Sequence, residues 1–263
     1  MGSRSRLLMT VLAFGYAFLY LPIALVAVYS FNESRLVTVW AGFSTKWWSA
    51  LFANDAMLDA AFLSLRIALV SATVSALLGL AAGYVLARVP AFPGRTLFGG
   101  LIVAPMVMPE VVMGISMLLL FVGAERVFGG PERGFLTITI AHITFSMAFV
   151  AIVVQARLAD FDRALEEAAM DLGATPWVTF MTITLPLIAP ALASGWMLAF
   201  TLSLDDLIMT QFVAGAQSQT LPMRVYSSVR LGVDPQINVL ATIVVGVAAT
   251  ALILSGWLTR QRA

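Results

Sequence analysis

The sequence predicts an all-α membrane protein that crosses the bilayer with six helices. Of its 263 residues, 60% are hydrophobic and only 11% are charged, and the mean hydropathy is +0.95. An ordinary soluble domain carries about 25% charged residues, whereas about 20 apolar residues in a helix can span a bilayer. Six apolar runs of this kind lie at about residues 7–31, 60–87, 97–122, 135–155, 184–212 and 237–258.

The first run is longer than the apolar part of a signal peptide, about 7–15 residues, so we expect an uncleaved first span. The polar segment that follows, residues 32–59, carries Trp40, Trp47 and Trp48 beside Lys46. Tryptophan and lysine at this density are typical of a membrane interface. An even number of spans places both chain termini on one side of the membrane.

The orientation follows from the positive charges. With the termini inside, eight arginines lie on the inner side and six positive residues on the outer side. The positive-inside rule therefore favours cytoplasmic termini. The inner set is Arg4, Arg6, Arg88, Arg95, Arg157, Arg163, Arg260 and Arg262, and the outer set is Arg35, Lys46, Arg126, Arg133, Arg224 and Arg230.

Composition excludes several kinds of site. The chain has no cysteine and one histidine, His142, which excludes disulfides, thiolate metal sites and a histidine cluster. Its one lysine follows no glycine-rich run, so a phosphate-binding P-loop is not expected. The net charge of +1 gives no indication of nucleic-acid binding. We expect no cofactor in this chain, and any ATP and magnesium would be bound by another subunit.

A short amphipathic helix is predicted between the fourth and fifth spans. One face carries Leu165, Ala168, Ala169 and Leu172 at helical spacing. Asp162 can cap its start and Gly173 can end it in the left-handed conformation. Thr175 and Pro176 are a typical N-cap and first residue of a second helix. The predicted unit is helix, glycine elbow, helix.

The charge of this stretch argues against a helix that lies on lipid headgroups, because such helices are usually basic. From Arg157 to Asp171 there are five carboxylates and two arginines, which favours docking on a protein. The order Glu167-Ala168-Ala169, Gly173, Ile183, Leu185-Pro186 resembles the cytoplasmic coupling motif of ATP-binding-cassette (ABC) importer permeases. The resemblance implies a loop, about residues 156–183, that inserts into a groove of an ATPase subunit.

The same resemblance implies roles for five residues. Glu167 would anchor the elbow, Ala168 and Ala169 would permit close docking, and Gly173 would permit the turn, with Leu172 on the docking face. It also implies the type I importer permease fold, with residues 1–59 as first helix and periplasmic interfacial segment, 60–258 as permease core and 259–263 as cytoplasmic tail.

Three carboxylates are predicted inside the membrane, where each must face a partner or a water-filled path. Glu110 follows Pro105 and Pro109, and a backbone broken by proline at membrane depth is tolerated where it lines a cavity. The alternative is a simple kink in which a neighbouring span satisfies Glu110.

Asp205 and Asp206 lie in the outer half of the fifth span. If the helix is continuous, Ser203, Asp206 and Thr210 form one polar stripe, which favours Asp206 as the pathway residue and Asp205 as a contact to another helix. The alternative for both is a structural role, with a charge partner such as Arg66. Aromatic residues of the same span can add cation–π attraction or serve packing: Trp196, Phe200 and Phe212.

Further stretches resemble the polyamine subfamily, the putrescine and spermidine permeases: 28–32, 201–207 and 220–238. This implies a dicationic amine substrate and three kinds of partner in a bacterial inner membrane: an ABC ATPase dimer, a second homologous permease subunit and a periplasmic polyamine-binding protein. One alternative is a permease for another small solute. A second is a proton-coupled secondary transporter that uses Glu110, Asp205 or His142; otherwise His142 is an interhelical donor. An enzyme would need a paired catalytic constellation, which one histidine and no cysteine do not favour.

Overall fold

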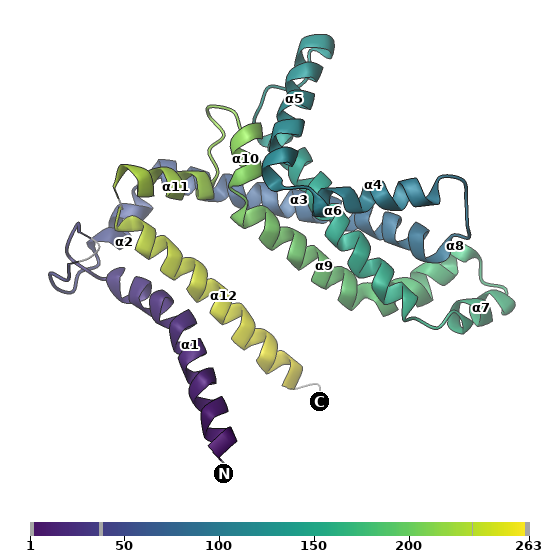
Figure 1. Ribbon diagram of the computed structural model, residues 1–263, viewed down its shortest axis with the longest axis horizontal. Coiled ribbons are helices and arrows are strands. Elements are labelled where there is room, and N and C mark those ends of the chain that lie inside the picture. The colour runs from purple at the N-terminus through teal and green to yellow at the C-terminus, as the bar shows by residue number, and fades with distance from the viewer. Residues whose placement is uncertain (1–2, 37–38, 233, 261–263) are drawn as a thin grey trace. The chain divides into compact units, whose positions relative to one another are not determined.

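The computed structural model describes residues 3–36, 39–232 and 234–260. Within these ranges the regular elements are helices, with one isolated bridge between Asn32 and Phe43, so the all-α expectation is confirmed (Figure 1). Of the predicted tail, residues 261–263 lie outside the described part. The helices are α1 (Ser3–Tyr29), α2 (Lys46–Phe52), α3 (Asp55–Arg88), α4 (Arg95–Val107), α5 (Glu110–Phe128), α6 (Phe135–Ala159), α7 (Ala164–Asp171), α8 (Pro176–Thr179), the π-helix η1 (Phe180–Thr184), α9 (Leu185–Asp205), α10 (Ile208–Val213), α11 (Leu221–Leu231) and α12 (Gln236–Arg260).

Five helical stretches among the described residues are long and apolar enough to cross a membrane, and two shorter apolar helices accompany them. The long stretches include the predicted first, second and fourth spans. The five are Leu7–Tyr29, Asp55–Arg88, Glu110–Phe128, Phe135–Ala159 and Pro176–Asp205, and the shorter ones are Arg95–Val107 and Gln236–Thr250.

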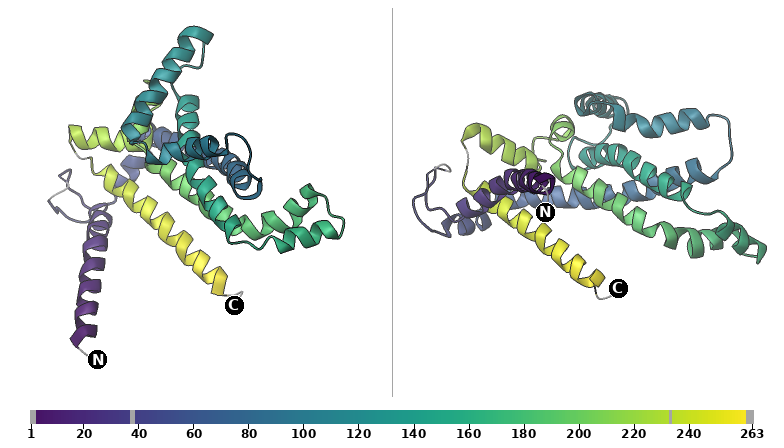
Figure 2. Two further views of the ribbon diagram at one scale, coloured as in Figure 1. Left: turned by 45° about the vertical axis from the view of Figure 1, so that its right-hand side comes forward. Right: turned by 60° about the horizontal axis from the view of Figure 1, so that its bottom comes forward.

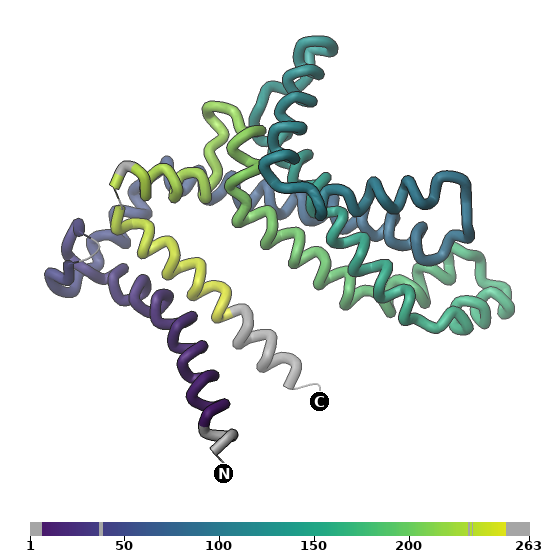
Figure 3. The backbone as a smooth tube through the Cα atoms, in the orientation of Figure 1, coloured from purple at the N-terminus to yellow at the C-terminus, as the bar shows by residue number. Residues whose placement is uncertain are grey.

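The predicted third span, 97–122, is not one helix. It is divided into α4 and α5 at Met108 and Pro109, and the chain turns sharply there (Figure 3). A residue before proline is driven into the extended region by the proline ring, and Met108 has φ −74° and ψ 136°. Pro109 lacks the amide hydrogen that would continue the hydrogen-bond ladder. Glu110 is therefore the first residue of a new helix.

The predicted fifth span, 184–212, is also interrupted. The helical stretch begins earlier, at Pro176, runs through α8, η1 and α9, and ends at Asp205. Asp206 is extended, with φ −64° and ψ 120°. Its carboxylate accepts the backbone N–H of Thr210 at 2.7 Å, as a capping carboxylate does at the start of a helix. The continuous helix assumed for the polar stripe is thus wrong, because α9 ends at Asp205 and Asp206 is an extended residue before α10.

Contacts within the chain divide it into two compact units, residues 60–223 and residues 1–59 with 224–263. In the first unit α6 packs against α9 and α4, and α10 packs against α5; Figure 2 shows α6 beside α9 from two directions. In the second unit α12 packs against α1 and α2. There the Asn32 side chain donates to the Val39 carbonyl and accepts from the Ala41 N–H, which joins both ends of the segment after α1.

Three arginines cap main-chain carbonyls at one end of α3 and α6. The last carbonyls of a helix have no partner within the helix, and cationic side chains stabilise that end. Arg88 Nη1 donates to the Leu158 carbonyl oxygen at 2.9 Å, Arg95 Nη2 to the Leu86 oxygen at 2.6 Å, and Arg163 Nη2 to the Ala87 oxygen at 3.1 Å. All three arginines belong to the predicted inner set.

Gly83 of α3 lets the α6 backbone approach closely. A Cβ at this position would lie 2.6 Å from the Ala151 carbonyl oxygen, a main-chain atom that cannot move alone. We expect Gly83→Ala to lower the free energy of unfolding by about 1–3 kcal/mol, the usual cost of overpacking. Thermal unfolding of the purified chain in detergent measures this. Gly100→Ala in α4 is the control, since nothing lies within 4 Å of its Cβ; equal losses in both variants would contradict the prediction.

Candidate functional site

The stretch between α6 and α9 has the predicted local structure. The Asp162 carboxylate accepts the Ala164 N–H at 2.9 Å at the start of α7. After α7, Gly173 has φ +88°, a conformation that only glycine adopts without strain. Thr175 Oγ1 accepts the Val178 N–H at 3.4 Å, with Pro176 at the first position of α8. Helix, glycine elbow and helix are confirmed.

One side of α7 and its end form an exposed apolar surface. Leu165 is 50% exposed, Met170 43% and Leu172 91%. Ala168 and Glu167 are exposed beside them, and Ala169 is half-buried. An apolar surface of this kind on an otherwise acidic helix is typical of a docking surface for a protein. The five residues that the coupling motif singles out therefore lie together, and four of them are accessible.

Glu166, which the sequence analysis did not single out, is the carboxylate that binds within the chain. Its Oε2 lies 2.9 Å from Arg88 Nε, and its Oε1 accepts the Thr184 hydroxyl at 2.6 Å. Glu166 and Thr184 are buried, as is the Arg88 side chain at 8% exposure. Glu167, one residue later, is exposed. The sequence shows that this stretch is acidic, but it does not show which glutamate is buried, because the partner Arg88 lies on a helix far away in the chain.

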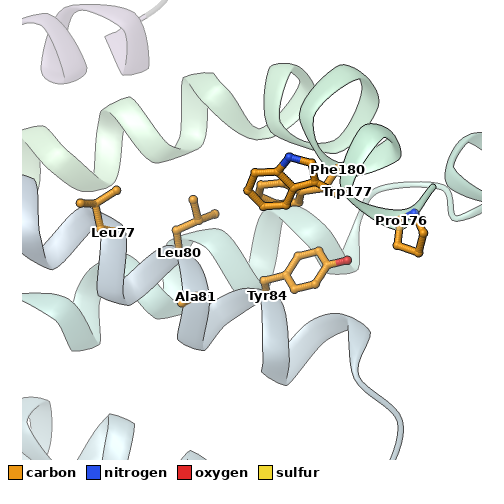
Figure 4. Close-up of a pocket in the computed structure, with 7 residues that line it drawn as sticks. All are labelled: Leu77, Leu80, Ala81, Tyr84, Pro176, Trp177 and Phe180. Atoms are coloured by element: carbon orange, nitrogen blue, oxygen red, sulfur yellow. The ribbon is translucent and has the colours of Figure 1, made fainter. Parts of the chain in front are cut away.

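An apolar pocket of about 350 Å³ lies beside the elbow, between α3 and the segment α8–η1. Figure 4 shows Trp177 and Phe180 above Tyr84. The rings of Trp177 and Phe180 stack with centres 5.9 Å apart, and Tyr84 meets Phe180 edge-on at 5.3 Å. No carboxylate lines this pocket among the described residues, so it does not suit an amine.

A second pocket, of about 310 Å³, contains all three predicted membrane carboxylates. It lies where the two chain breaks meet, since Glu110 begins α5 and Asp205 ends α9. Unwound backbone at membrane depth is tolerated where it lines a cavity. The pocket is lined by Glu110, Phe145, Leu202, Asp205, Asp206, Leu207 and Ile208. The packing of α5 on α10 holds it together, because Gly114 leaves room for the Phe212 ring.

The formal charges of this pocket favour a cation. Helix ends of both signs meet here, since α9 ends at Asp205 with partial negative charge, while α5 and α10 begin at Glu110 and Ile208 with partial positive charge. Broken helices present their C-terminal carbonyls to cations in this way in transporters. Three carboxylates add formal negative charge, and the Phe145 ring offers an aromatic face. The arrangement can replace the hydration of an ammonium group.

His142 of α6 is the centre of a buried polar network. Its Nδ1 lies 2.7 Å from Ser203 Oγ, and its Nε2 lies 2.9 Å from Thr210 Oγ1 and 3.3 Å from Asp206 Oδ2. Ser71 of α3 donates to Ser203 at 3.0 Å. Ser203, Asp206 and Thr210 therefore do lie together as predicted. They meet around His142 and on both sides of the helix break after Asp205, not along one helix.

The hydrogen bonds of this network lead to Asp206. Thr210 donates its hydroxyl to Asp206 Oδ2 at 2.5 Å, besides its N–H. Since that hydroxyl proton is used, Thr210 Oγ1 accepts from His142 Nε2–H, and in a neutral ring Nδ1 accepts from Ser203. Asp206 is thus held in one orientation while it lines the pocket. His142 is an interhelical donor, as one of the two interpretations expected.

The contacts of the two aspartates differ from the predicted ones. Asp206 makes the bonds to a neighbouring helix that were expected of Asp205, whereas Asp205 is exposed in this chain. Arg66, the alternative charge partner, instead lies with its guanidinium 4.5 Å from the centre of the Phe135 ring. Glu110 is exposed at the start of α5.

The aromatic residue of the pocket, Phe145, was missed by the sequence analysis, because it lies on α6 and not on the span of the aspartates. Of the residues proposed for cation–π contact, Trp196 and Phe200 stack on each other with centres 5.4 Å apart, and Phe212 packs at Gly114. These three residues serve packing. Phe145 carried no signal in the sequence beyond an aromatic ring near the middle of a span.

Known proteins resemble this chain over nearly its full length. The putrescine transport system permease protein PotI of Escherichia coli (strain K12) is 54% identical over 244 residues, which cover 92% of this chain and 87% of that protein. The spermidine/putrescine transport system permease protein PotC of the same strain is 42% identical over 247 residues, covering 94% and 91%. Both names describe transport subunits and not enzymes.

Solved structures share the fold. A chain of a bacterial ABC transporter involved in the import of the acidic polysaccharide alginate superposes with a TM-score of 0.72, covering 99% of this chain and 98% of that one, at 16% identity. The family model described as binding-protein-dependent transport system inner membrane component matches residues 77–260. The chain belongs to this family and is a multi-pass, all-α permease subunit of the inner membrane.

Proposed function

We propose that this chain is the transmembrane permease subunit of an ATP-driven, binding-protein-dependent importer of polyamines, with putrescine as first substrate and spermidine as second. The observation that carries the substrate class is the pocket in which Glu110, Asp205 and Asp206 meet beside Phe145. The names of the relatives at 54% and 42% identity support it. The fold alone carries no substrate, since the alginate importer shares it.

The proposed complex has three kinds of partner: an ABC ATPase dimer that binds ATP and magnesium, a second homologous permease subunit, and a periplasmic polyamine-binding protein. Both termini lie in the cytoplasm, which places α7 at the ATPase. Residues 1–59 form the first helix and interfacial segment, residues 60–258 the permease core with its coupling loop at about 156–183, and residues 259–263 the tail.

In this mechanism ATP closes the ATPase dimer and moves α7, which docks through Glu167, Ala168, Ala169 and Leu172 and turns at Gly173. The membrane helices then open outward, the binding protein releases the amine, and the amine passes the carboxylate pocket. Asp206 is already oriented by His142 and Thr210. The accessible Asp205 and Glu110 are the carboxylates that exchange water for ammonium.

The test is putrescine uptake and putrescine-stimulated ATP hydrolysis by the complex reconstituted with its binding protein. We expect Asp205→Asn and Glu110→Gln each to lower uptake by about tenfold or more, since a hydrogen bond to a charged group contributes about 1.5–3 kcal/mol. Asp206→Asn should lower uptake as well, because the anionic Oδ2 of Asp206 accepts the hydrogen bonds of Thr210. Glu125→Gln, at the far end of α5 and outside the pocket, is the matched control.

Three outcomes would contradict the proposal in different ways. Absence of putrescine stimulation in the native complex would assign the chain to another solute. Stimulation and uptake that survive all three pocket substitutions would keep the substrate and make the carboxylates structural. Uptake that depends on a proton gradient and not on ATP would indicate a secondary transporter.

A further inference from the structure

The coupling helix α7 has two neighbouring glutamates with opposite surroundings. Successive residues of a helix point about 100° apart, so Glu166 and Glu167 cannot share a face. Glu167 is exposed, whereas Glu166 is buried and directed into the chain. The exposed carboxylate is available to a partner. The buried one is available only to groups of this subunit.

Each carboxylate oxygen of Glu166 is bound by a different element. Oε2 pairs with Arg88 at the end of α3, and Oε1 accepts from Thr184, the last residue of η1. Arg88 also donates to the Leu158 carbonyl in the last turn of α6 and lies 5.4 Å from the Phe161 ring centre. Four helical elements therefore converge on one buried ion pair.

The chain segments that join α7 to α6 and α8 are short and irregular. Residues 160–163 precede α7 and residues 172–175 follow it, and both segments are non-helical. The second contains Gly173, around whose Cβ position nothing lies within 4 Å. The orientation of α7 relative to α3 therefore depends on non-covalent contacts between the two helices. A buried ion pair with additional hydrogen bonds fixes one geometry, and its burial protects it from screening by salt.

We propose that Arg88, Glu166 and Thr184 form a clamp that makes α7 move as one body with the inner end of α3 and with η1. This inference rests on the proposed coupling of α7 to an ATPase. Movement of α7 is transmitted to the membrane helices through the clamp, at α3 and at η1, and not only through the glycine elbow. Arg88, Glu166 and Thr184 are then positioning residues: they bind neither the amine nor the ATPase.

The test compares amine transported per ATP hydrolysed in the reconstituted complex with its binding protein. We expect Glu166→Gln to lower this ratio by at least about fivefold, the lower end of typical coupling between two sites, with ATP hydrolysis retained. Loss of folded complex would lower both rates together and leave the ratio unchanged. Asp160→Asn is the matched control, since it removes an exposed carboxylate from the segment before α7. Thr184→Val, which removes one bond at constant size, replaces Glu166→Gln if the latter fails to assemble.

A second measurement needs no substrate. Because the chain has no cysteine, spin labels can be placed at Asp171→Cys in α7 and Val89→Cys beyond α3 in the nucleotide-free complex. We expect a narrow distance distribution that broadens in Glu166→Gln and not in Asp160→Asn. An unchanged distribution together with an unchanged ratio would overturn the clamp. If putrescine did not stimulate ATP hydrolysis by the native complex, the proposed function would be overturned. The distance measurement would still test the clamp, because it needs no substrate.

Discussion

Gly173→Pro is expected to uncouple ATP hydrolysis from transport while the subunit still inserts into the membrane. Gly173 has φ +88°, whereas proline fixes φ near −65°. The substitution also removes the N–H that donates to the Met170 carbonyl at 2.9 Å. The chain would leave α7 in another direction, and the docking surface of Leu165, Met170 and Leu172 would turn away from the ATPase. We expect amine uptake to fall by at least about tenfold, equivalent to 1.4 kcal/mol.

The control at the same position is Gly173→Asn. Asparagine adopts the left-handed conformation more readily than other residues with a side chain, and no heavy atom lies within 4 Å of the Cβ that it would add. Uptake and ATP hydrolysis by reconstituted complexes at equal abundance are the measurement. Asparagine should keep most of the transport that proline loses. Normal uptake by Gly173→Pro would remove the elbow from the coupling mechanism.

His142→Ala is expected to cause a large loss of stability. It removes the donor to Thr210 and the acceptor of the Ser203 hydroxyl, and each buried polar group left without its partner costs about 1–3 kcal/mol. The carboxylate and the start of α10 would lose their attachment to α6. We expect the thermal unfolding midpoint in detergent to fall by at least about 4 °C, taking the lower figures of about 1 kcal/mol for each of the two groups and about 2 °C per kcal/mol.

Two further variants test whether the loss of stability comes from the His142 hydrogen bonds or from a general defect in α6. Gln has an N–H donor and a carbonyl acceptor that can replace the two ring nitrogens of a neutral histidine, so His142→Gln should recover much of the midpoint. Thr144→Ala removes a hydroxyl that donates to the Ile140 carbonyl within α6 and should change the midpoint little. A His142→Ala midpoint equal to that of Thr144→Ala would contradict the role assigned to the network.

The features that were predicted correctly from the sequence are those that depend on residues close together in the chain. The capping aspartate, the elbow glycine and the Thr175-Pro176 start act within a few residues of one another, and all three are confirmed. The break at Pro109 was readable for the same reason, since a missing N–H needs no partner. The likeness of motifs to a permease family is also confirmed, since the family model matches residues 77–260, which contain the coupling motif.

What the sequence did not predict depends on pairs far apart in the chain. The motif marks Glu167 but does not show that Glu166 is buried, because that burial depends on Arg88 and Thr184, which fold against it from distant parts of the chain. The break at Asp206 was missed because a run of apolar residues continues past it, and a carboxylate that caps the next helix resembles a polar residue in the same helix. His142 became central only when α6 met α9 and α10.

The arginine bonds at the ends of α3 and α6 have a consequence for how this protein tolerates mutation. Each guanidinium donates to a main-chain oxygen, at Leu86, Ala87 or Leu158, and every residue type supplies that oxygen. The acceptor positions are therefore free to change within the limits of packing, whereas the donors need the reach and fork of arginine, which lysine lacks. In a library with every substitution at each position, Leu86, Ala87 and Leu158 should tolerate more substitutions than Arg88, Arg95 and Arg163.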